Sequence, residues 1–124
     1  MKVLFVFLLA VFSSNTFAVT YLCVAEAGAG VKNTGSVISA EVYDVSDNKY
    51  VISDESGDWK FKSLGNNSSA LTCDTEYFCE VKGGFASVFF RSNDGIFTYI
   101  FQTAIDEKAK NIITYTIKGY CSAL

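Results

Sequence analysis

Hydrophobic and polar residues alternate along much of the chain. Residues 58–63 place Trp59 and Phe61 on one face and two lysines on the other, and residues 96–103 and 112–118 alternate in the same way. A period of two, in segments rich in β-branched and aromatic side chains, is typical of strands with one buried face. Further strands are predicted at residues 20–26, 37–43, 49–53, 70–74, 77–82 and 85–91.

Turn-forming residues separate these predicted strands. Asn93-Asp94-Gly95 lies between two apolar runs and predicts a hairpin, because Asp and Gly tolerate the positive φ of tight turns. Turns are also predicted at residues 54–57, 65–68 and 83–84. Strands that follow one another through short turns describe an antiparallel meander.

Two stretches depart from the alternation. Residues 25–39 are rich in Ala and Gly, and we predict a long irregular loop there, or a loop that contains a short helical turn. Residues 104–111 have a helical composition but would form only about two turns, too few to be stable without packing. We predict a charged loop there, between the last two strands.

The first 18 residues have the features of a secretory signal peptide. Lys2 precedes an apolar run over residues 3–12, and a polar stretch then leads to Thr16-Phe17-Ala18, which has the small residues required before a cleavage site. The alternative is a membrane anchor. A span needs ~20 apolar residues, however, and the run over residues 3–12 is well short of that length. No later segment reaches it either. We therefore expect cleavage after Ala18 and export to the periplasm or the medium, which leaves a single domain of residues 19–124.

Four cysteines follow the predicted cleavage site: Cys23, Cys73, Cys79 and Cys121. An even number in a short exported chain predicts two disulfides, for which three pairings exist. The spacing of Cys73 and Cys79 suits a bond across a turn, and Cys23 and Cys121 lie near the two ends of the domain, so this pairing is favoured. No C-x-x-C pair is present, and neither a cysteine metal site nor a redox motif is predicted.

A sheet of seven or eight strands with one apolar face must close or fold over itself to cover that face. Closure places the first and last strands side by side, which is the geometry that a bond between Cys23 and Cys121 requires. The predicted fold is therefore all-β: a small antiparallel meander of about 7–8 strands, forming a barrel or a strongly curved sheet.

Composition excludes several kinds of chemistry. The chain has 124 residues, enough for one domain, and contains no His, which excludes every triad that uses imidazole and the usual zinc ligand set. Ten basic residues stand against 13 acidic ones, so a basic face for nucleic acid is not expected. The sequence predicts no catalytic residue, no cofactor and no metal.

Two acidic segments are candidate sites that we interpret as ordinary turns. Asp54, Glu55 and Asp58 flank the turn at Gly57, where carboxylates are solvated, whereas catalytic acid pairs need a cleft and one raised pKa. Residues 44–48 resemble the start of a calcium loop, but the Gly of the sharp turn and the closing Glu are missing.

The strands predicted at residues 85–91 and 96–101 are apolar on both faces. One face belongs to the core, or lines a pocket for an apolar ligand. A strand that is apolar on both faces is either central and covered or part of a surface that binds a partner. The residues on the second face are Val88, Phe90, Ile96 and Ile100.

Three short segments resemble a known family. Residues 21–26 read Y-L-C-V-A-E and are followed by Gly30, residues 115–122 end in G-Y-C-S, and residues 49–51 fit a middle strand. In these segments the chain resembles a family of small exported bacterial proteins of unknown function. The resemblance implies export, one β-domain and an outer cysteine pair, and it carries no activity. The Gly- and Ala-rich residues 27–35 depart from the family's pattern.

We expect an exported, non-catalytic binding module, either an inhibitor or an envelope accessory protein, whose partner is an unknown protein or glycan. In layout it is similar to periplasmic lysozyme-inhibitor barrels, although their inhibitory motif is not recognisable here. The alternative is a lipocalin-like barrel that carries a small apolar ligand, and a hydrolase that uses carboxylates alone is a third hypothesis. The oligomeric state is not predicted. A packed interior would favour the binding module, and a hollow one the carrier.

Overall fold

The computed structural model describes residues 19–55, 57–64, 71–81, 87–104 and 111–124. The predicted signal peptide, the predicted turns at residues 65–68 and 83–84, and residues 105–110 of the predicted charged loop lie outside the described residues. The strands of the described part are β1 (Thr20–Thr34), β2 (Val37–Tyr43), β3 (Lys49–Glu55), β4 (Asp58–Ser63), β5 (Leu71–Thr75), β6 (Phe78–Glu80), β7 (Ser87–Arg91), β8 (Ile96–Ala104) and β9 (Ile112–Ala123).

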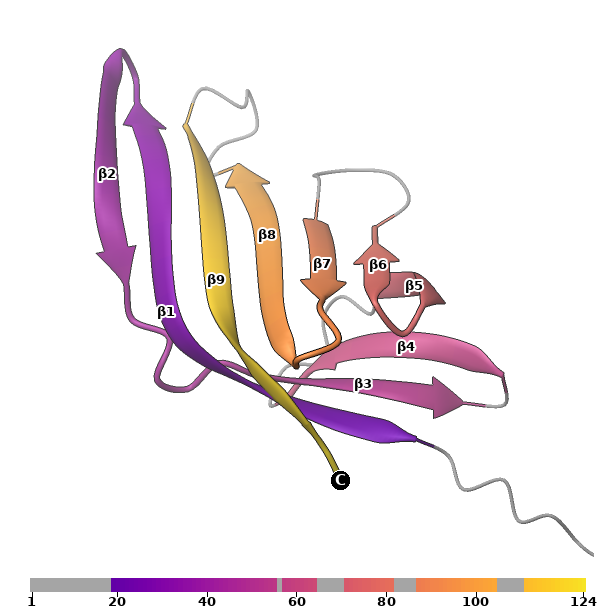
Figure 1. The fold of residues 1–124 in the computed structure, drawn as a ribbon. Coiled ribbons are helices and arrows are strands. Elements are labelled where there is room, and N and C mark those ends of the chain that lie inside the picture. The colour runs from indigo at the N-terminus through magenta and orange to yellow at the C-terminus, as the bar shows by residue number, and fades with distance from the viewer. Residues whose placement is uncertain (1–18, 56, 65–70, 82–86, 105–110) are drawn as a thin grey trace, which may run out of the picture.

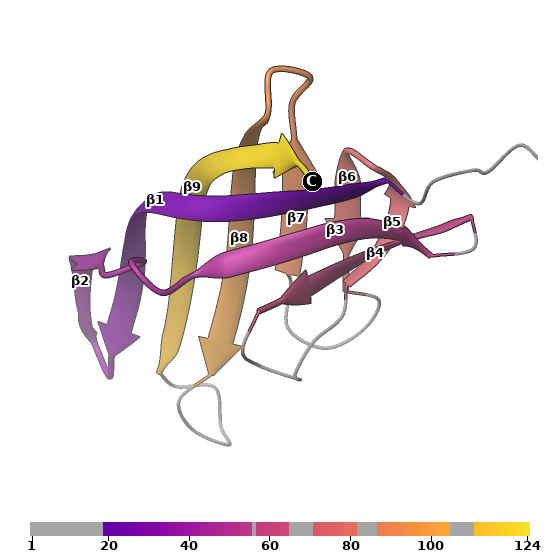
Figure 2. The ribbon, with the colours of Figure 1, turned by 90° about the horizontal axis from the view of Figure 1, so that it is seen from below.

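Eight of these strands form a closed antiparallel barrel, which confirms the predicted fold class. The ring runs β1-β3-β4-β5-β6-β7-β8-β9 and closes where β9 pairs with β1. The ninth strand, β2, lies outside the ring and pairs with residues 28–34 of β1. Figure 1 shows this part of the sheet extending away from the ring, with β2 at its edge. Figure 2 shows β1 lying between the end of β9 and β3.

A β-bulge divides β1 into two parts. The pairing with β9 shifts register between Ala25 and Ala27, and a bulge bends the strand that carries it. Residues 20–24, before the bulge, pair with β3, whereas residues 28–34, after it, pair with β2. We call β2, residues 27–34 of β1 and residues 112–118 of β9 the wing.

The prediction of a long loop over residues 25–39 is wrong. Strand β1 continues to Thr34, and a tight turn with Gly35 at φ 61° leads directly into β2. The small residues have a packing role instead: a Cβ added to Gly30 would lie 2.7 Å from Cδ1 of Tyr115. The strand thus leaves out a side chain where a ring from β9 needs the space, and its backbone pairs on both edges.

Both predicted disulfides are confirmed. Cys23 and Cys121 face each other across the pair β1–β9, with an S–S distance of 1.99 Å. Cys73 and Cys79 face each other across the pair β5–β6, with an S–S distance of 2.03 Å. The first bond therefore links the two strands at which the barrel closes.

Aromatic rings fill the core of the barrel. Phe61, Phe89 and Phe97 are fully buried, with Tyr50 and Tyr99 nearly so. Successive ring centroids lie 4.7 Å apart for Phe61–Phe89 and 5.2 Å apart for both Tyr50–Phe61 and Phe61–Tyr99. Each such ring buries ~150–250 Å². Burial raises the pKa of Tyr50 to about 12, because the charged phenolate is disfavoured away from water.

In the described part of the chain, one charged side chain, that of Arg91, is buried. Arg91, the last residue of β7, places its guanidinium carbon 4.0 Å from the ring centroid of Tyr21 and 4.8 Å from that of Tyr77. Its Nε donates to the backbone oxygen of Glu76 at 3.2 Å, and its Nη2 lies 3.6 Å from Oε2 of the same residue. The two rings and the carboxylate stabilise the buried charge, although Nη2 itself has no hydrogen-bond partner among the described residues.

Candidate binding surface

The outer surface of the wing is exposed and mainly carries aliphatic and small side chains, with threonines on β9 and Lys118 at its border. The register of the strands sets one row of directly opposite residues across five strands: Val88, Ile100, Thr116, Ala29 and Val42. A second row contains Gln102, Thr114, Val31 and Ala40. No residue of either row is charged. We call these two rows, together with Ile38 beside them on β2, the outer face.

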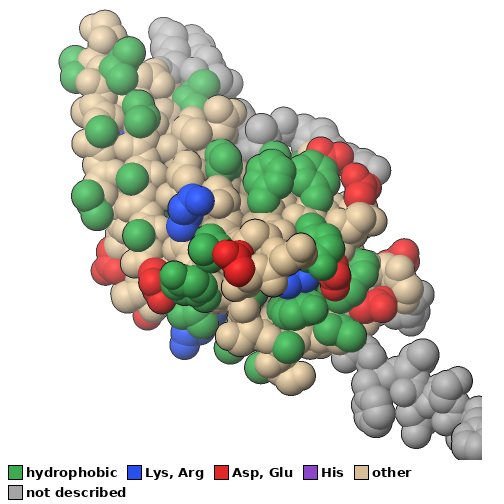
Figure 3. Space-filling model, in the orientation of Figure 1, with side chains coloured by type: hydrophobic (Ala, Val, Ile, Leu, Met, Phe, Trp, Pro, Cys, Tyr) green, Lys and Arg blue, Asp and Glu red, His purple; other side chains and the backbone are tan. Residues whose placement is uncertain are grey.

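The aliphatic side chains of the outer face are unusually exposed for residues of a sheet. Val42 is 91% exposed, Ile38 75% and Val31 53%. Figure 3 shows hydrophobic side chains distributed over this part of the surface, with the acidic side chains gathered elsewhere. Contiguous apolar surface without charge is typical of sites that bind another molecule.

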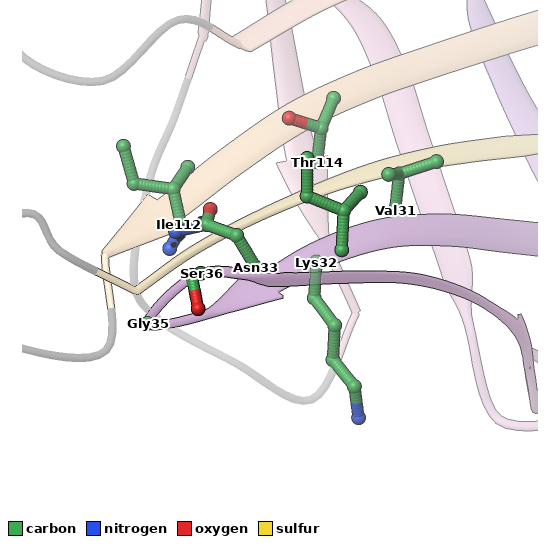
Figure 4. Close-up of a pocket in the computed structure, with 8 residues that line it drawn as sticks. Val31, Lys32, Asn33, Gly35, Ser36, Ile112 and Thr114 are labelled. Carbon is green, nitrogen blue, oxygen red and sulfur yellow. Dashed lines mark hydrogen bonds between the residues drawn. The ribbon is translucent and has the colours of Figure 1, made fainter.

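A shallow hollow lies at the tip of the wing, where the hairpin β1–β2 meets the start of β9 (Figure 4). Val31, Ile38 and Ile112 give it apolar walls. Two amides hold its end in place: Asn33 Oδ1 accepts from the backbone N–H of Ile112 at 3.2 Å, and Asn111 Oδ1 accepts from that of Gly35 at 2.9 Å. These two bonds hold the β1–β2 hairpin against the start of β9 at this end of the hollow.

The inner surface of the wing carries aromatic rings instead. Tyr115 lies 4.6 Å from Tyr43 and 5.1 Å from Phe101, between ring centroids, and Phe101 lies 5.1 Å from Tyr99 of the core. Phe101, Tyr115 and Tyr43 are only half-buried. A continuous row of rings thus connects the wing to the interior of the barrel.

Two charges of the wing lie on this inner surface and are paired, whereas the third, Lys118, is exposed on the outer side in the row next to the outer face. Lys32 Nζ lies 2.9 Å from Glu41 Oε2, and Tyr115 donates its hydroxyl to Glu41 Oε1 at 3.2 Å. The hydrogen bond from Lys32 lowers the pKa of Glu41 below 4.5, and the same bond raises the pKa of Lys32 above 10.5. Burial is the main cause that raises the pKa of Tyr115. Pairing on the inner side leaves the outer face neutral.

The second apolar face predicted from the sequence continues the outer face onto the barrel. Phe90 is 46% exposed and packs in a tilted arrangement against Phe78, at 5.3 Å between centroids, and Ile96 is 38% exposed. Val88 and Ile100, opposite each other, belong to the first row of the outer face. The sequence therefore located the barrel part of this surface and missed the wing. The alternation of residues 37–43 did predict a strand. It did not predict that this strand would lie at the edge of the sheet, with one face exposed.

The structure places Asp54 and Glu55 at the end of β3 and Asp58 at the start of β4, where they flank the turn at Gly57 as predicted. Asp54 Oδ1 accepts from the backbone N–H of Gly57 at 2.8 Å, and Glu55 pairs with Lys60 and Lys62 at 3.3 and 3.0 Å. The hydrogen bond from Lys62 is the main cause that lowers the pKa of Glu55, whereas a general acid needs a raised one.

The calcium-like segment also forms a turn. Asp44 Oδ1 accepts from the backbone N–H of Ser46 at 3.0 Å, and that bond lowers the pKa of Asp44. Within the described ranges, no three or more Asp, Glu, Cys or His side chains cluster so that they could hold a metal ion.

No family model, curated protein or solved structure matches this chain. Among the residues that the structure describes, no helix is long and apolar enough to cross a membrane.

Proposed function

We propose that this chain is an exported, non-catalytic binding module that recognises a protein partner through its outer face. The observation that carries the proposal is the exposure of Val42, Ile38 and Val31 close together in a part of the sheet where the two rows of the outer face carry no charge. The centres of protein interfaces are depleted of charged residues and are well packed once the partner is bound. An uncharged glycan would be expected to use aromatic platforms, and the outer face of the wing has none.

The interior of the barrel supports binding on the outside. Tyr50, Phe61, Phe89, Phe97 and Tyr99 contact one another where a lipocalin-like carrier would hold its ligand. A carrier of this architecture would have to move several buried rings, at a cost in packing, to admit a small apolar molecule. The barrel itself is compatible with both functions, and the filled centre favours the binding module.

Export is supported by the two disulfides. Bonds of this kind persist in oxidising compartments, which agrees with the signal peptide predicted at residues 1–18 and with cleavage after Ala18.

Partner capture with a matched pair of variants tests the proposal. Val31→Asp introduces a charge at the middle of the outer face, and Leu64→Asp introduces the same charge at an exposed leucine outside the outer face. The purified protein and both variants are immobilised and exposed to the exported fraction of the source cells. We expect one protein to be retained by the wild type and by Leu64→Asp, and at least ~30-fold less by Val31→Asp. Equal retention by all three, or no retained protein, would contradict the proposal.

A further inference from the structure

The edge of β2 is open. Within the described residues β2 pairs only with β1, so one side of its backbone carries unpaired N–H and C=O groups. Natural sheets protect such edges with Lys, Pro or bulges, or with a charged side chain turned inward. Strand β2 contains no Lys, the whole chain contains no Pro, and the single charge of β2, Glu41, is already paired with Lys32. This edge has little protection against pairing with another strand.

The turn determines which backbone groups face outward. Residues 34 and 37 flank a two-residue turn and are directly opposite each other, which makes them a hydrogen-bonded pair in hairpins of this type. Hydrogen-bonded and non-hydrogen-bonded pairs alternate along an antiparallel ladder. The backbone groups of Ile38, Ala40 and Val42 therefore point to the free edge, and those of Ser39 and Glu41 point to β1.

Strand β2 is complementary to itself when turned by 180°. Its midpoint is Ala40, so an antiparallel pairing centred there aligns all seven residues with those of a second copy. Ile38 then lies opposite Val42, and Ala40 opposite Ala40, on the outer face. On the other face Glu41 lies opposite Ser39, so no two like charges are opposed.

We propose that β2 pairs with β2 of a second copy, antiparallel and with the two-fold axis at Ala40. This goes beyond the proposed function, because it uses the backbone edge of the wing, whereas the partner is recognised by the outer face. Pairing joins two barrels through one continuous sheet and extends the outer face across both copies. Each copy has one such edge in its described part, so the contact is isologous and closes at two subunits. A seven-residue contact is small for an interface, and we expect a weak dimer.

Sedimentation velocity of the purified exported protein from ~10 µM to ~1 mM measures the association. Ala40→Pro removes an N–H that the monomer does not use, and edge strands tolerate Pro at such a position. We expect this variant to associate at least ~10-fold more weakly, because two-fold symmetry removes two hydrogen bonds at once. The matched control, Ala40→Ser, keeps the N–H and should dimerise as the wild type does.

A second variant keeps the test valid if Pro disturbs the wing. Ala40→Lys places two ammonium groups opposite each other at the axis, so its dimer should weaken at low salt and recover at high salt. Amide exchange followed by NMR reads out the register: protection of Ile38, Ala40 and Val42 should rise with concentration, while that of Ser39 and Glu41 stays constant.

Three results would overturn the inference: a wild type that is monomeric at ~1 mM, dimerisation unaffected in both Ala40→Pro and Ala40→Lys, or concentration-dependent protection confined to other strands. Val31→Asp separates this inference from the proposed function. Its charge lies on β1 and leaves the edge of β2 unchanged. It should still dimerise while losing the partner, so the two proposals can fail independently.

Discussion

The barrel and the wing are built from the same strands but are stabilised differently. In its first half β1 buries Cys23 and Ala25 within the ring, whereas in its second half Val31 is 53% exposed. Strands of the ring have a core of rings on their inner side and a disulfide at the point of closure. The wing has strand pairing, a partly exposed row of rings and one ion pair. Closure of the sheet, more than the composition of a strand, decides where stability lies.

This difference makes the barrel the rigid part of the molecule and leaves the surface of the wing accessible for binding. Regions with few buried apolar contacts open at lower free energy than closed cores do. Within the wing, Asn33 and Asn111 hold the hairpin β1–β2 against the start of β9, and the contact of Tyr115 with Phe101 connects the wing to the core. It can therefore hold its shape and still present the outer face and the free edge.

Removing the outer disulfide should give the largest loss of stability. The double variant Cys23→Ser/Cys121→Ser frees a loop with a sequence separation of 98, which the chain-entropy model values at ~4.7 kcal/mol. The control Cys73→Ser/Cys79→Ser frees a separation of 6 and should lose only ~2 kcal/mol by the same relation. Urea denaturation of both variants measures the difference. A larger loss of stability for Cys73→Ser/Cys79→Ser would contradict the prediction.

Truncating one aromatic residue of the core should come next. Phe89→Ala removes a fully buried ring that contacts Phe61 and Phe97, and should lower the free energy of unfolding by ~3–5 kcal/mol. Val42→Ala, at 91% exposure in the wing, should change it by less than ~0.5 kcal/mol. Comparable losses in denaturant titrations would mean that the outer surface of the wing is covered within the monomer.

Substitutions of two glycines, one at the closure of the barrel and one in the wing, should have smaller effects on stability. A Cβ on Gly119 would lie 2.0 Å from the backbone oxygen of Val24, which cannot move without opening the closure between β1 and β9. A Cβ on Gly30 would lie 2.7 Å from the ring of Tyr115, which is half-buried and can turn aside. Gly119→Ala should therefore cost ~3 kcal/mol and Gly30→Ala ~1 kcal/mol, measured by thermal unfolding. The opposite order would show that the wing is as rigid as the barrel.

Acid should destabilise the wing locally. We expect this to be the smallest of the four predicted effects on stability. The lowered pKa of Glu41 means that its ionised form stabilises the folded state above the ordinary value of 4.5. This contribution is lost as the pH falls through the lowered pKa. Amide exchange in β2, corrected for intrinsic rates, should therefore accelerate at low pH in the wild type. In Glu41→Gln this dependence should disappear, and its persistence would assign the effect to other carboxylates.

The sequence was sufficient to predict the ring and its closure. Alternation in segments such as Asp58–Ser63 depends on local residues alone, and each turn signal acts between neighbours. Cys23 and Cys121 added one long-range constraint, which made the first strand and the last strand adjacent. These inferences depend on the alternation of hydrophobic and polar residues and on a pair of cysteines. Both can be read from a single sequence.

The wing and its outer face could not be predicted, because they depend on partners distant in sequence. Gly30 lies in a strand that pairs on both edges, and its missing side chain leaves space for the ring of Tyr115. The sequence of residues 25–39 alone does not indicate that ring. Likewise, Val42 becomes exposed because β2 is left outside the ring, which is a property of the sheet order. The buried position of Arg91 depends in the same way on Tyr21, which is close in space but far away in the sequence.

The pairing of β1 with β9 also has a consequence for the order of folding. Contacts between residues as far apart in sequence as 23 and 121 form slowly, because the intervening chain must first be confined. Because the chain is synthesised from its N-terminus, the first strand forms before the last one is available to pair with it. In that interval Cys23 is a free thiol that can be oxidised with Cys73 or Cys79, so that timely maturation requires either slow oxidation or a catalyst that exchanges incorrect bonds.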